Sequence, residues 1–324
     1  MSSALGACGI VTTAENANVG IVGAGVMGFA MANNLRAAGF QVFGYDPAKA
    51  AEDRLHDIGG IVVRSPREVA ERCRTILFSL PSAEALVDSV GGETGVASAP
   101  VRETVVIECS TLPLDAKRSA FDVLAASDKI MLDCPVSGTG AQAAQKDLVV
   151  FGSGDAEAFD RSLPVMAGMS RVQRYVGVFG NGSIMKYIAN LLVTVHNVAA
   201  AEALVLGMKA GLPPAMLYDT LADSAGTSRM FQVRGPLMRD SQYDAATATI
   251  RTHLKDIEII NGFASGLQCP TPLFAAAAQA YYARAAQGFE MQDTASVCAV
   301  MEGMAGLVRD DAVDNRRHHR AEVT

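Results

Sequence analysis

Two polar side chains, Lys186 and Asn190, lie four residues apart in an otherwise apolar stretch. Oxidising an alcohol needs a group that accepts the hydroxyl proton as hydride leaves carbon, and the reverse reduction needs a proton donor. A lysine does both when burial and neighbours bring its pKa down from about 10.4 towards the working pH. Residues four apart share a helix face, so the Asn190 amide can hold a substrate hydroxyl or fix the ammonium. We interpret Lys186 and Asn190 as catalytic; the alternative for Lys186 is a surface lysine near a helix start.

A glycine-rich loop is suited to binding the hydride carrier. The run Val19–Val22 leads directly into G-x-G-x-x-G. In such loops the first glycine permits a tight turn, the second lets the backbone approach a pyrophosphate, and the third lets helix and strand pack closely. The helix start supplies N–H donors and a positive dipole end. A plain glycine turn is the alternative, but it explains neither the strand before nor the helix after. The predicted cofactor residues here are Gly23, Gly25, Val26, Met27 and Gly28.

An acidic residue follows at the spacing expected for ribose recognition. The next β-rich run ends at Asp46, 18 residues beyond Gly28. A carboxylate there accepts hydrogen bonds from the adenosine ribose hydroxyls and repels a 2′-phosphate. NAD is therefore favoured over NADP, although Lys49 close by could soften the preference. The alternative for Asp46 is a turn residue before Pro47.

The elements that must position these residues follow a βαβ pattern up to about Tyr175. Helical stretches such as Val26–Ala38, Ser82–Val90 and Pro113–Ala125 lie between short β-branched runs. This alternation predicts right-handed crossovers and a mainly parallel, doubly wound sheet of the Rossmann type. The predicted strands are Val19–Val22, Gln41–Tyr45, Ile61–Val63, Thr75–Ser79, Thr104–Ile107, Ile130–Leu132, Leu148–Phe151 and Arg171–Tyr175.

After Gly182 the pattern becomes helical throughout. A long helix is predicted over 183–210, closed by Gly211 and the Pro213-Pro214 pair. Further helices are predicted at about 214–223, 244–264, 272–286 and 293–308. We therefore predict an α/β domain followed by an all-α domain built around a long interdomain helix. The predicted boundaries are a flexible N-terminus (1–18), a dinucleotide-binding domain (19–179), a helical substrate and oligomerisation domain (180–308) and a charged flexible tail (309–324).

Four separated segments together resemble the β-hydroxyacid dehydrogenase family, which includes 3-hydroxyisobutyrate dehydrogenase and tartronate semialdehyde reductase. The first is the glycine loop with the following 31–35, Met-Ala-Asn-Asn-Leu. The second, Asp-Cys-Pro-Val-Ser-Gly at 133–138, is similar to the family's substrate-binding D-x-P-V-S-G segment. The third, from Gly180 to Asn190, is similar to its catalytic G-x-G-x-x-x-K-x-x-x-N segment. The fourth is Lys255-Asp256, like the late K-D pair. The resemblance spans about residues 19 to 308.

The resemblance implies further site residues. Ser137 and Gly138 resemble the anchor for a substrate carboxylate. Thr139 stands where many members have a second glycine, and Lys146 stands where a turn glycine is usual, which leaves the substrate open. The alternative for this segment is a simple turn. Phe231 is expected either to wall the substrate pocket or to pack in a core. The implied cofactor contacts are Leu80, Pro81, Thr111, next to Ser110, and Lys255, each of which could instead be an ordinary loop or helix-surface residue.

The implied activity is NAD-dependent interconversion of a small 3-hydroxyacid and its aldehyde or ketone. The candidate substrates resemble 3-hydroxyisobutyrate, glycerate or a sugar acid. In the related 6-phosphogluconate dehydrogenases, the lysine is followed by a His-Asn pair and then an acid that assists decarboxylation. Here Ala189 precedes Asn190, and the apolar residues 191–193 follow it. We therefore predict a reaction without decarboxylation.

Three other functions fit the same residues less well. An imine reductase of the same fold commonly has Asp or Tyr at the position of Lys186. A non-catalytic NAD-binding adaptor would be expected to lose that lysine. A histidine-based 2-hydroxyacid dehydrogenase needs a His–acid pair with a carboxylate-binding Arg, a setting that His196 and His253 lack.

Composition argues against several other classes of protein. Hydrophobic residues make up 50% and charged residues 19% of the 324 residues, which suits a compact enzyme. The net charge of −7 argues against a nucleic-acid-binding face, which needs clustered Lys and Arg. The six cysteines form no C-x-x-C pair and have no nearby His at ligand spacing, so we predict reduced thiols and no metal site.

We also expect a cytoplasmic protein. The first seventeen residues lack a basic start followed by an apolar run, which argues against a secretory signal. The stretch Ile188–Leu206 is apolar, but it contains Asn190, His196, Asn197 and Glu202, which are costly in lipid. We interpret it as a helix buried between domains rather than a membrane span. Because the Ala-rich helices need cover, we expect a homodimer or homotetramer.

Overall fold

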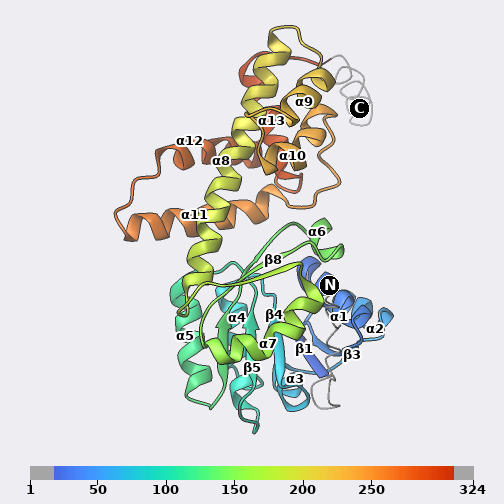
Figure 1. Ribbon diagram of the computed structural model, residues 1–324, viewed down its shortest axis with the longest axis vertical. Coiled ribbons are helices and arrows are strands. Elements are labelled where there is room, and N and C mark those ends of the chain that lie inside the picture. The colour runs from blue at the N-terminus through green and yellow to red at the C-terminus, as the bar shows by residue number, and fades with distance from the viewer. Residues whose placement is uncertain (1–17, 310–324) are drawn as a thin grey trace, which may run out of the picture. The chain divides into compact units, whose positions relative to one another are not determined.

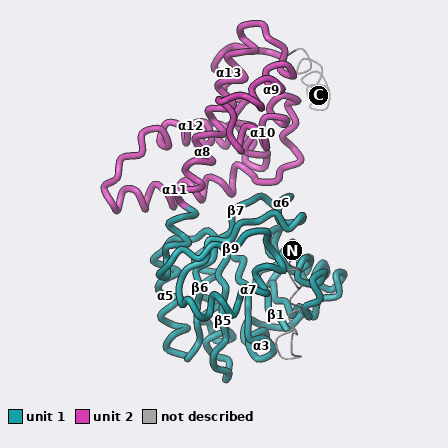
Figure 2. Tube along the Cα trace, viewed as in Figure 1, with its two compact units in different colours: residues 1–186 teal, residues 187–324 magenta. Residues whose placement is uncertain are grey.

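The computed structural model describes residues 18–309. The predicted flexible N-terminus and charged tail lie outside these residues, apart from Asn18 and Arg309. The chain divides into two compact units, residues 1–186 (unit 1) and residues 187–324 (unit 2), which Figure 2 shows in different colours.

Unit 1 contains a six-stranded sheet with the strand order β3-β2-β1-β4-β5-β6 (Figure 1). Every neighbouring pair is parallel. The strand order reverses between β1 and β4, so their carboxyl ends lie where doubly wound sheets bind ligands. The strands are β1 (Asn18–Val22), β2 (Gln41–Tyr45), β3 (Ile61–Val62), β4 (Thr75–Phe78), β5 (Val105–Glu108) and β6 (Ile130–Asp133).

Helices cover both faces of this sheet, because successive side chains of each strand point to opposite faces. Leu77 of β4 packs in a core with residues of α1 and α7, whereas its neighbours Ile76 and Phe78 pack in a second core with residues of α3, α4 and α5. The helices of unit 1 are α1 (Val26–Ala37), α2 (Lys49–Asp57), α3 (Pro66–Arg72), α4 (Ala83–Gly91), the 3₁₀ helix η2 (Val96–Ser98), α5 (Leu114–Ala125), α6 (Gly140–Ala144) and α7 (Ala156–Met169).

A separate three-stranded sheet follows β6, with the order β7 (Val136–Ser137), β8 (Val149–Gly152) and β9 (Val172–Tyr175). The sequence predicts β8 and β9 as strands but not this sheet. After Asp133 the chain turns at Pro135 into β7, which pairs antiparallel with β8, and β8 then pairs parallel with β9. An isolated bridge between Asp133 and Ser153 connects the two sheets.

The helix α8 (Asn181–Lys209) begins in unit 1 and continues into unit 2. It ends before Gly211, which has a φ of 90°. Leu204, Ile257 and Tyr281 are among the buried residues that form one core in unit 2. The remaining helices of unit 2 are α9 (Pro214–Ala222), α10 (Arg229–Arg239), α11 (Ile250–Gly266), α12 (Pro272–Ala286), the 3₁₀ helix η3 (Thr294–Ser296) and α13 (Val297–Met304). The predicted fold class, a Rossmann-type sheet followed by an all-α domain around a long helix, is confirmed.

The helix predicted from residue 244 begins only at Ile250. Asp293 Oδ2 accepts hydrogen bonds from the backbone N–H groups of Thr247 (3.0 Å) and Ala248 (3.4 Å), and this pairing replaces helical hydrogen bonds. Thr249 then caps α11, since its hydroxyl accepts from the N–H of Thr252. The stretch predicted as a helix over 293–308 divides into η3 and α13 and ends at Met304.

Among the described residues, one helix, α8, is long and apolar enough to cross a membrane by length and composition. Of the 18 consecutive residues in its apolar stretch, 44% are buried. Two of its polar side chains within unit 2 bond to other helices of that unit. The hydroxyl of Thr194 lies 2.8 Å from His253 Nε2, and the Asn197 amide donates to the Tyr281 hydroxyl at 2.9 Å. Such pairing is typical of a core helix in a folded domain.

Candidate active site

The three glycines of the predicted cofactor loop have different surroundings. Gly23 has a φ of 88°, and a Cβ there would lie 2.3 Å from the carbonyl oxygen of Ser79. A Cβ on Gly28 would lie 2.0 Å from the carbonyl oxygen of Gly23. At Gly25, by contrast, a Cβ would meet no atom of the described chain within 4 Å. The first and third glycines are thus required by packing, whereas the second leaves an open space, as pyrophosphate binding demands.

The start of α1 borders this open space. Gly25 is the N-cap residue, and in the described structure no side chain caps this helix end and its first turn contains no acidic residue. The first N–H groups of α1 can therefore donate to an anion. Val26 at the first helical position is 71% exposed, which suits a residue that a nucleotide covers, whereas Met27 packs partly against the core.

Asp46 at the end of β2 binds the glycine loop directly. Its Oδ2 accepts a hydrogen bond from the backbone N–H of Ala24 at 2.7 Å, and its Oδ1 accepts from the N–H of Ala48 at 2.9 Å. The second bond belongs to a turn, which is the alternative role of Asp46, while the first joins Asp46 to the glycine loop. Lys49 is paired with Asp53 at 2.9 Å and with Glu52 at 3.4 Å, so its charge is compensated locally.

The loops after β4 and β5 are joined by a hydrogen bond to a side chain. The N–H of Leu80 donates to the hydroxyl of Ser110 at 2.8 Å. Leu80 and Ser110 are buried, Pro81 is exposed and Thr111 is half-buried. The structure therefore brings together the two loops that the resemblance places near the cofactor.

The segment predicted to bind the substrate carboxylate turns sharply after β7. Gly138 has a φ of 144°, and a Cβ there would lie 2.6 Å from a methyl group of Leu148. Ser137 before it is partly exposed. Thr139 forms a capping box on α6 with Gln142, in which the Thr139 N–H donates to Gln142 Oε1 at 3.0 Å. The backbone N–H of Thr139 is thus already hydrogen-bonded to Gln142.

Lys146, which the resemblance places where a turn glycine is usual, has a φ of 59°. This left-handed conformation is the one that glycine adopts at least cost. Lys146 therefore replaces the expected glycine but adopts the same turn conformation.

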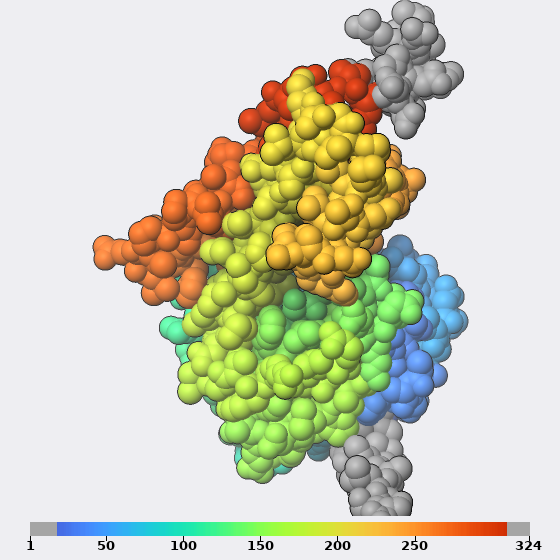
Figure 3. All heavy atoms as spheres, turned by 45° about the horizontal axis from the view of Figure 1, so that its top comes forward, coloured from blue at the N-terminus to red at the C-terminus, as the bar shows by residue number. Residues whose placement is uncertain are grey.

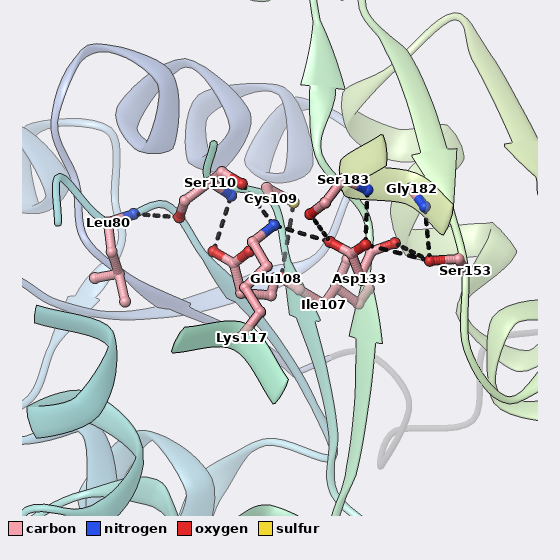
Figure 4. A network of polar contacts seen from close by, with 10 residues as sticks. All are labelled: Leu80, Ile107, Glu108, Cys109, Ser110, Lys117, Asp133, Ser153, Gly182 and Ser183. Carbon is pink, nitrogen blue, oxygen red and sulfur yellow. Dashed lines mark hydrogen bonds and ion pairs between the residues drawn. The ribbon is translucent and has the colours of Figure 1, made fainter. Parts of the chain in front are cut away.

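The start of α8 is fixed to the two sheets of unit 1 by buried polar groups, which Figure 4 shows. Asp133 at the end of β6 accepts hydrogen bonds from the N–H of Ser183 at 2.7 Å and from its hydroxyl at 2.8 Å. The hydroxyl of Ser153 accepts from the N–H of Gly182 at 2.9 Å. Lys186 follows on the same helix and is buried, with 8% of its surface exposed. It is therefore not the surface lysine of the alternative interpretation.

Asn190 lies one turn beyond Lys186 on α8, within unit 2. Its amide donates to Asp256 Oδ2 at 2.7 Å, and both residues are buried. Lys255 Nζ lies 3.6 Å from Asp256 Oδ1. The structure thus joins Asn190, from the predicted catalytic segment, to the Lys255-Asp256 pair in unit 2.

Phe231 packs in the core of unit 2. It is 3% exposed, and its ring stacks on that of Tyr218 with centroids 5.6 Å apart. Its N–H donates to the hydroxyl of Ser228, the N-cap of α10. These contacts correspond to the core-packing alternative, and a role as a wall of the substrate pocket stays a prediction.

Sequence reasoning missed a buried charged cluster at the carboxyl ends of β5 and β6. Glu108, Lys117 and Asp133 are all fully buried, and Lys117 forms ion pairs with both acids. The available signal was an acidic residue directly after each of two strongly apolar runs, Val105–Ile107 and Met131–Leu132. The described part of the chain contains no group of three or more His, Cys, Asp or Glu side chains placed to hold a metal ion.

A Rossmann loop that leaves space for a phosphate, together with a buried lysine on the helix that follows this domain, defines a nicotinamide-dependent dehydrogenase. Residues 18–180 match the family model described as the NAD-binding domain of 6-phosphogluconate dehydrogenase. Residues 180–301 match the one described as the NAD-binding part of NADP-dependent 3-hydroxyisobutyrate dehydrogenase. The chain belongs to the β-hydroxyacid dehydrogenase family, as the resemblance predicts.

Relatives agree with this assignment. The chain is 34% identical to L-threonate dehydrogenase of Cupriavidus necator over 288 residues, which cover 89% of this chain and 97% of that protein. It is similar to the crystal structure of 3-hydroxyisobutyrate dehydrogenase from Salmonella typhimurium, with a TM-score of 0.79, 30% identity, and coverage of 87% of this chain and 99% of that one. An imine reductase from Pseudomonas sp. is only 17% identical, with a TM-score of 0.55 and coverage of 88% and 99%, and so shares the fold alone.

The prediction of an enzyme is therefore confirmed. The chain is an NAD(P)-dependent dehydrogenase that acts on CH–OH groups of hydroxyacids, and its NAD-binding domains agree with the predicted cofactor. The comparisons do not favour the imine reductase or the non-catalytic adaptor.

Proposed function

We propose that this enzyme interconverts a small 3-hydroxyacid and its carbonyl form without decarboxylation, with Lys186 as general acid and base. The observation that carries the proposal is the buried lysine one helical turn before Asn190, on a helix whose start is fixed by Asp133. When bound, NAD would supply the hydride acceptor, and the glycine loop with the start of α1 would hold its pyrophosphate. The open space at Gly25 and the exposed Val26 fit that role.

In the oxidation, Lys186 Nζ takes the proton of the substrate hydroxyl, and in the reduction it returns that proton to the forming alkoxide. The Asn190 amide holds the hydroxyl or the ammonium. Because Asp256 accepts from the Asn190 amide nitrogen, the amide oxygen has a fixed direction, away from that carboxylate. Asn190 thus orients the reacting groups without adding a charge.

We propose that the substrate carboxylate binds at Ser137 and Gly138. The positive φ of Gly138 and the close Leu148 side chain require glycine here, and a residue without a side chain lets a ligand approach the backbone of this turn. Since the Thr139 N–H is engaged by Gln142, Thr139 would contribute its side-chain bulk rather than a backbone donor. A sugar acid such as L-threonate, the substrate named for a relative, is our first candidate, followed by 3-hydroxyisobutyrate and glycerate.

We propose NAD rather than NADP as the preferred cofactor. Asp46 lies at the end of β2 beside the glycine loop, where its charge would repel a 2′-phosphate. Lys49 does not offset this charge in our proposal, because it is paired with Asp53 and Glu52. The finer roles of Leu80, Pro81, Thr111 and Lys255 as cofactor contacts are part of the same proposal.

The decisive test is a screen for NAD reduction over L-threonate, 3-hydroxyisobutyrate, glycerate and related acids, with cyclic imines tested in the reverse direction. The variant Lys186→Ala should bind NAD and turn over no substrate. Lys209→Ala is the matched control, because Lys209 lies at the other end of α8 and donates only to the Ala305 carbonyl among the contacts described. Turnover by Lys186→Ala, or carbon dioxide released in proportion to NADH, would refute the mechanism.

We further propose a cytoplasmic homodimer or homotetramer that associates through unit 2. The end of unit 2 formed by α11 and α12 projects from its other helices (Figures 1 and 3). At this end Leu267 and Leu273 are 63% and 73% exposed, and such apolar surface favours association. Sedimentation equilibrium of the protein and of a Leu267→Lys, Leu273→Lys variant tests the proposal, since a monomer in both cases would contradict it.

A further inference from the structure

A second buried lysine of unit 1 has no part in the proposed proton transfer. Lys117 on α5 is fully buried, and its Nζ lies 2.5 Å from Glu108 Oε2, 2.8 Å from Asp133 Oδ1 and 2.7 Å from the carbonyl oxygen of Ser110 (Figure 4). The Ser110 carbonyl and Asp133 Oδ1 accept hydrogen bonds from this ammonium, and Glu108 Oε2 pairs with it as a close opposite charge. All three partners lie at the carboxyl ends of β5 and β6, the edge of the sheet where the site forms.

Glu108 connects this ammonium to the two loops near the proposed cofactor site. Its Oε1 accepts a hydrogen bond from the N–H of Ser110 at 2.9 Å. The Ser110 hydroxyl in turn accepts from the N–H of Leu80 at 2.8 Å. Lys117, Glu108 and Ser110 therefore fix the loop after β5 and, through it, the loop after β4.

Asp133 connects the same ammonium to the helix that carries Lys186. Its two oxygens accept from the N–H and the hydroxyl of Ser183 in the first turn of α8. The fit is close, because a Cβ on Gly182 would lie 2.5 Å from the Asp133 carbonyl oxygen. A carboxylate at a helix N-terminus also interacts favourably with the helix dipole. Lys186 lies three residues beyond Ser183, so a shift of Asp133 would shift Lys186.

The charges of this cluster depend on one another. Burial by itself lowers the pKa of Lys117, but the carboxylates of Asp133 and Glu108 outweigh it and the pKa is raised, so the amine stays charged. Without that ammonium, two buried carboxylates would face each other uncompensated, and one would be expelled or protonated. The positions of both strand ends therefore depend on Lys117.

We propose that Lys117 is a positioning residue that fixes the loops after β4 and β5 relative to the first turn of α8, and thereby aligns Lys186 with the cofactor. This inference rests on the proposed function only in taking Lys186 as the proton-transfer group. It differs from a purely structural role because it predicts a loss of turnover in folded enzyme that still binds NAD.

The test is Lys117→Met, which keeps an unbranched apolar chain and removes the ammonium. Misplacement of a catalytic group by about 1 Å can cost about 100-fold in rate, so kcat should fall by roughly that factor. The dissociation constant for NAD should rise by a much smaller factor than kcat falls, because the glycine loop and Asp46 lie outside the cluster and only the contacts proposed for the loops after β4 and β5 are disturbed. The primary isotope effect on kcat with carbon-deuterated substrate should rise as hydride transfer becomes rate-limiting.

Lys129→Met is the matched control. Lys129 is also a buried lysine of unit 1, but its Nζ donates to the carbonyl oxygens of Ala97, Ala99 and Ser127, ahead of β6 rather than at its carboxyl end. This variant should lose thermal stability and keep kcat per folded molecule. Equal losses of kcat in Lys117→Met and Lys129→Met, or full kcat in Lys117→Met, would overturn the inference.

Two further variants separate positioning from folding. The double variant Lys117→Met, Glu108→Gln removes one uncompensated charge and should recover Tm without recovering kcat. Ser183→Ala, which removes only the hydroxyl bond to Asp133, should lower kcat by a smaller factor, up to about tenfold, with NAD binding unchanged. If neither Lys117 variant folds, Ser183→Ala decides, and unchanged kcat and isotope effect there overturn the inference. Lys186→Ala distinguishes the two proposals, because turnover in that variant refutes the proposed mechanism whatever Lys117 does.

Discussion

The substitution Gly25→Ala separates cofactor binding from folding, because the new methyl group would enter open space. Gly25 has a φ of −63°, which alanine adopts freely, and a Cβ there would meet no described atom within 4 Å. Losing a glycine N-cap costs about 0.5–1 kcal/mol, and reducing the freedom of the unfolded chain returns about 0.4–1 kcal/mol. We therefore expect Tm to stay within about 2 °C of the parent protein.

NAD binding should respond differently. If the pyrophosphate approaches the backbone at Gly25, the methyl group displaces one or two charge-assisted hydrogen bonds, each contributing about 1.5–3 kcal/mol. The dissociation constant should then rise at least tenfold, since about 1.4 kcal/mol is a factor of ten. The chain contains no tryptophan, so calorimetric titration is the suitable assay, with circular dichroism for Tm.

Gly28→Ala is the matched comparison from the same loop. Its Cβ would lie 2.0 Å from the Gly23 carbonyl oxygen, a backbone atom that cannot move away cheaply. Overpacking of this kind costs about 2 kcal/mol, which lowers Tm by roughly 4–8 °C in a domain of this size. If Gly25→Ala bound NAD within twofold of the parent protein, or lost as much stability as Gly28→Ala, the assignment of the open space to the pyrophosphate would be refuted.

Three further predictions concern the proposed ribose-binding role of Asp46, the support of Asn190 by Asp256, and the buried thiols. Asp46→Asn keeps one acceptor for the glycine loop but removes the charge, so the ratio of kcat/KM for NAD over NADP should fall about tenfold. An unchanged ratio would show that Asp46 does not set the cofactor preference. Asp256→Ala deprives the Asn190 amide of its carboxylate, and we expect kcat to fall about tenfold with NAD affinity unchanged; an effect on substrate KM alone would indicate direct substrate contact. Burial raises the pKa of the Cys73 and Cys298 thiols to about 12, so in native protein at pH 8 they should resist iodoacetamide while the exposed Cys269 reacts. Because these thiols ionise near pH 9.0 in the unfolded chain, the free energy of unfolding should also decline as the pH rises above that value. Labelling of Cys73 by iodoacetamide in native protein would contradict its burial.

The sequence was sufficient for features that depend on local patterns. The approximate positions of the strands, the different requirements at the three loop glycines, and the long helix carrying Lys186 follow from periodicity and glycine geometry. The exact strand ends do not, since β5 and β6 each extend one residue further than predicted, to Glu108 and Asp133. Pairing between distant segments did not follow. Nothing local shows that Leu148–Phe151 pairs with β7 and β9 instead of extending the main sheet.

Charged residues in the interior were the hardest to predict. Lys117 occurs in a stretch that reads as an ordinary amphipathic helix, where a lysine is expected to reach solvent. Its burial depends on two acids brought from β5 and β6, which only the folded sheet places side by side. The same holds for Asp293, which takes the N–H groups of Thr247 and Ala248 and delays the start of α11.

The geometry of the proposed proton-transfer pair depends on one secondary structure element. Lys186 belongs to unit 1 and Asn190 to unit 2, but both lie on α8, where a rise of 1.5 Å per residue sets them about 6 Å apart along the axis. The first turn of the helix is held by Asp133 in unit 1, and from Asn190 onwards it is held by Asp256 and Tyr281 in unit 2. As long as α8 stays intact, the Lys186 amine and the Asn190 amide therefore keep their relative positions on the same helix face. Extending α8 by one residue between Ile188 and Ala189 would break that register by about 100° of rotation, and should abolish turnover while each unit still folds.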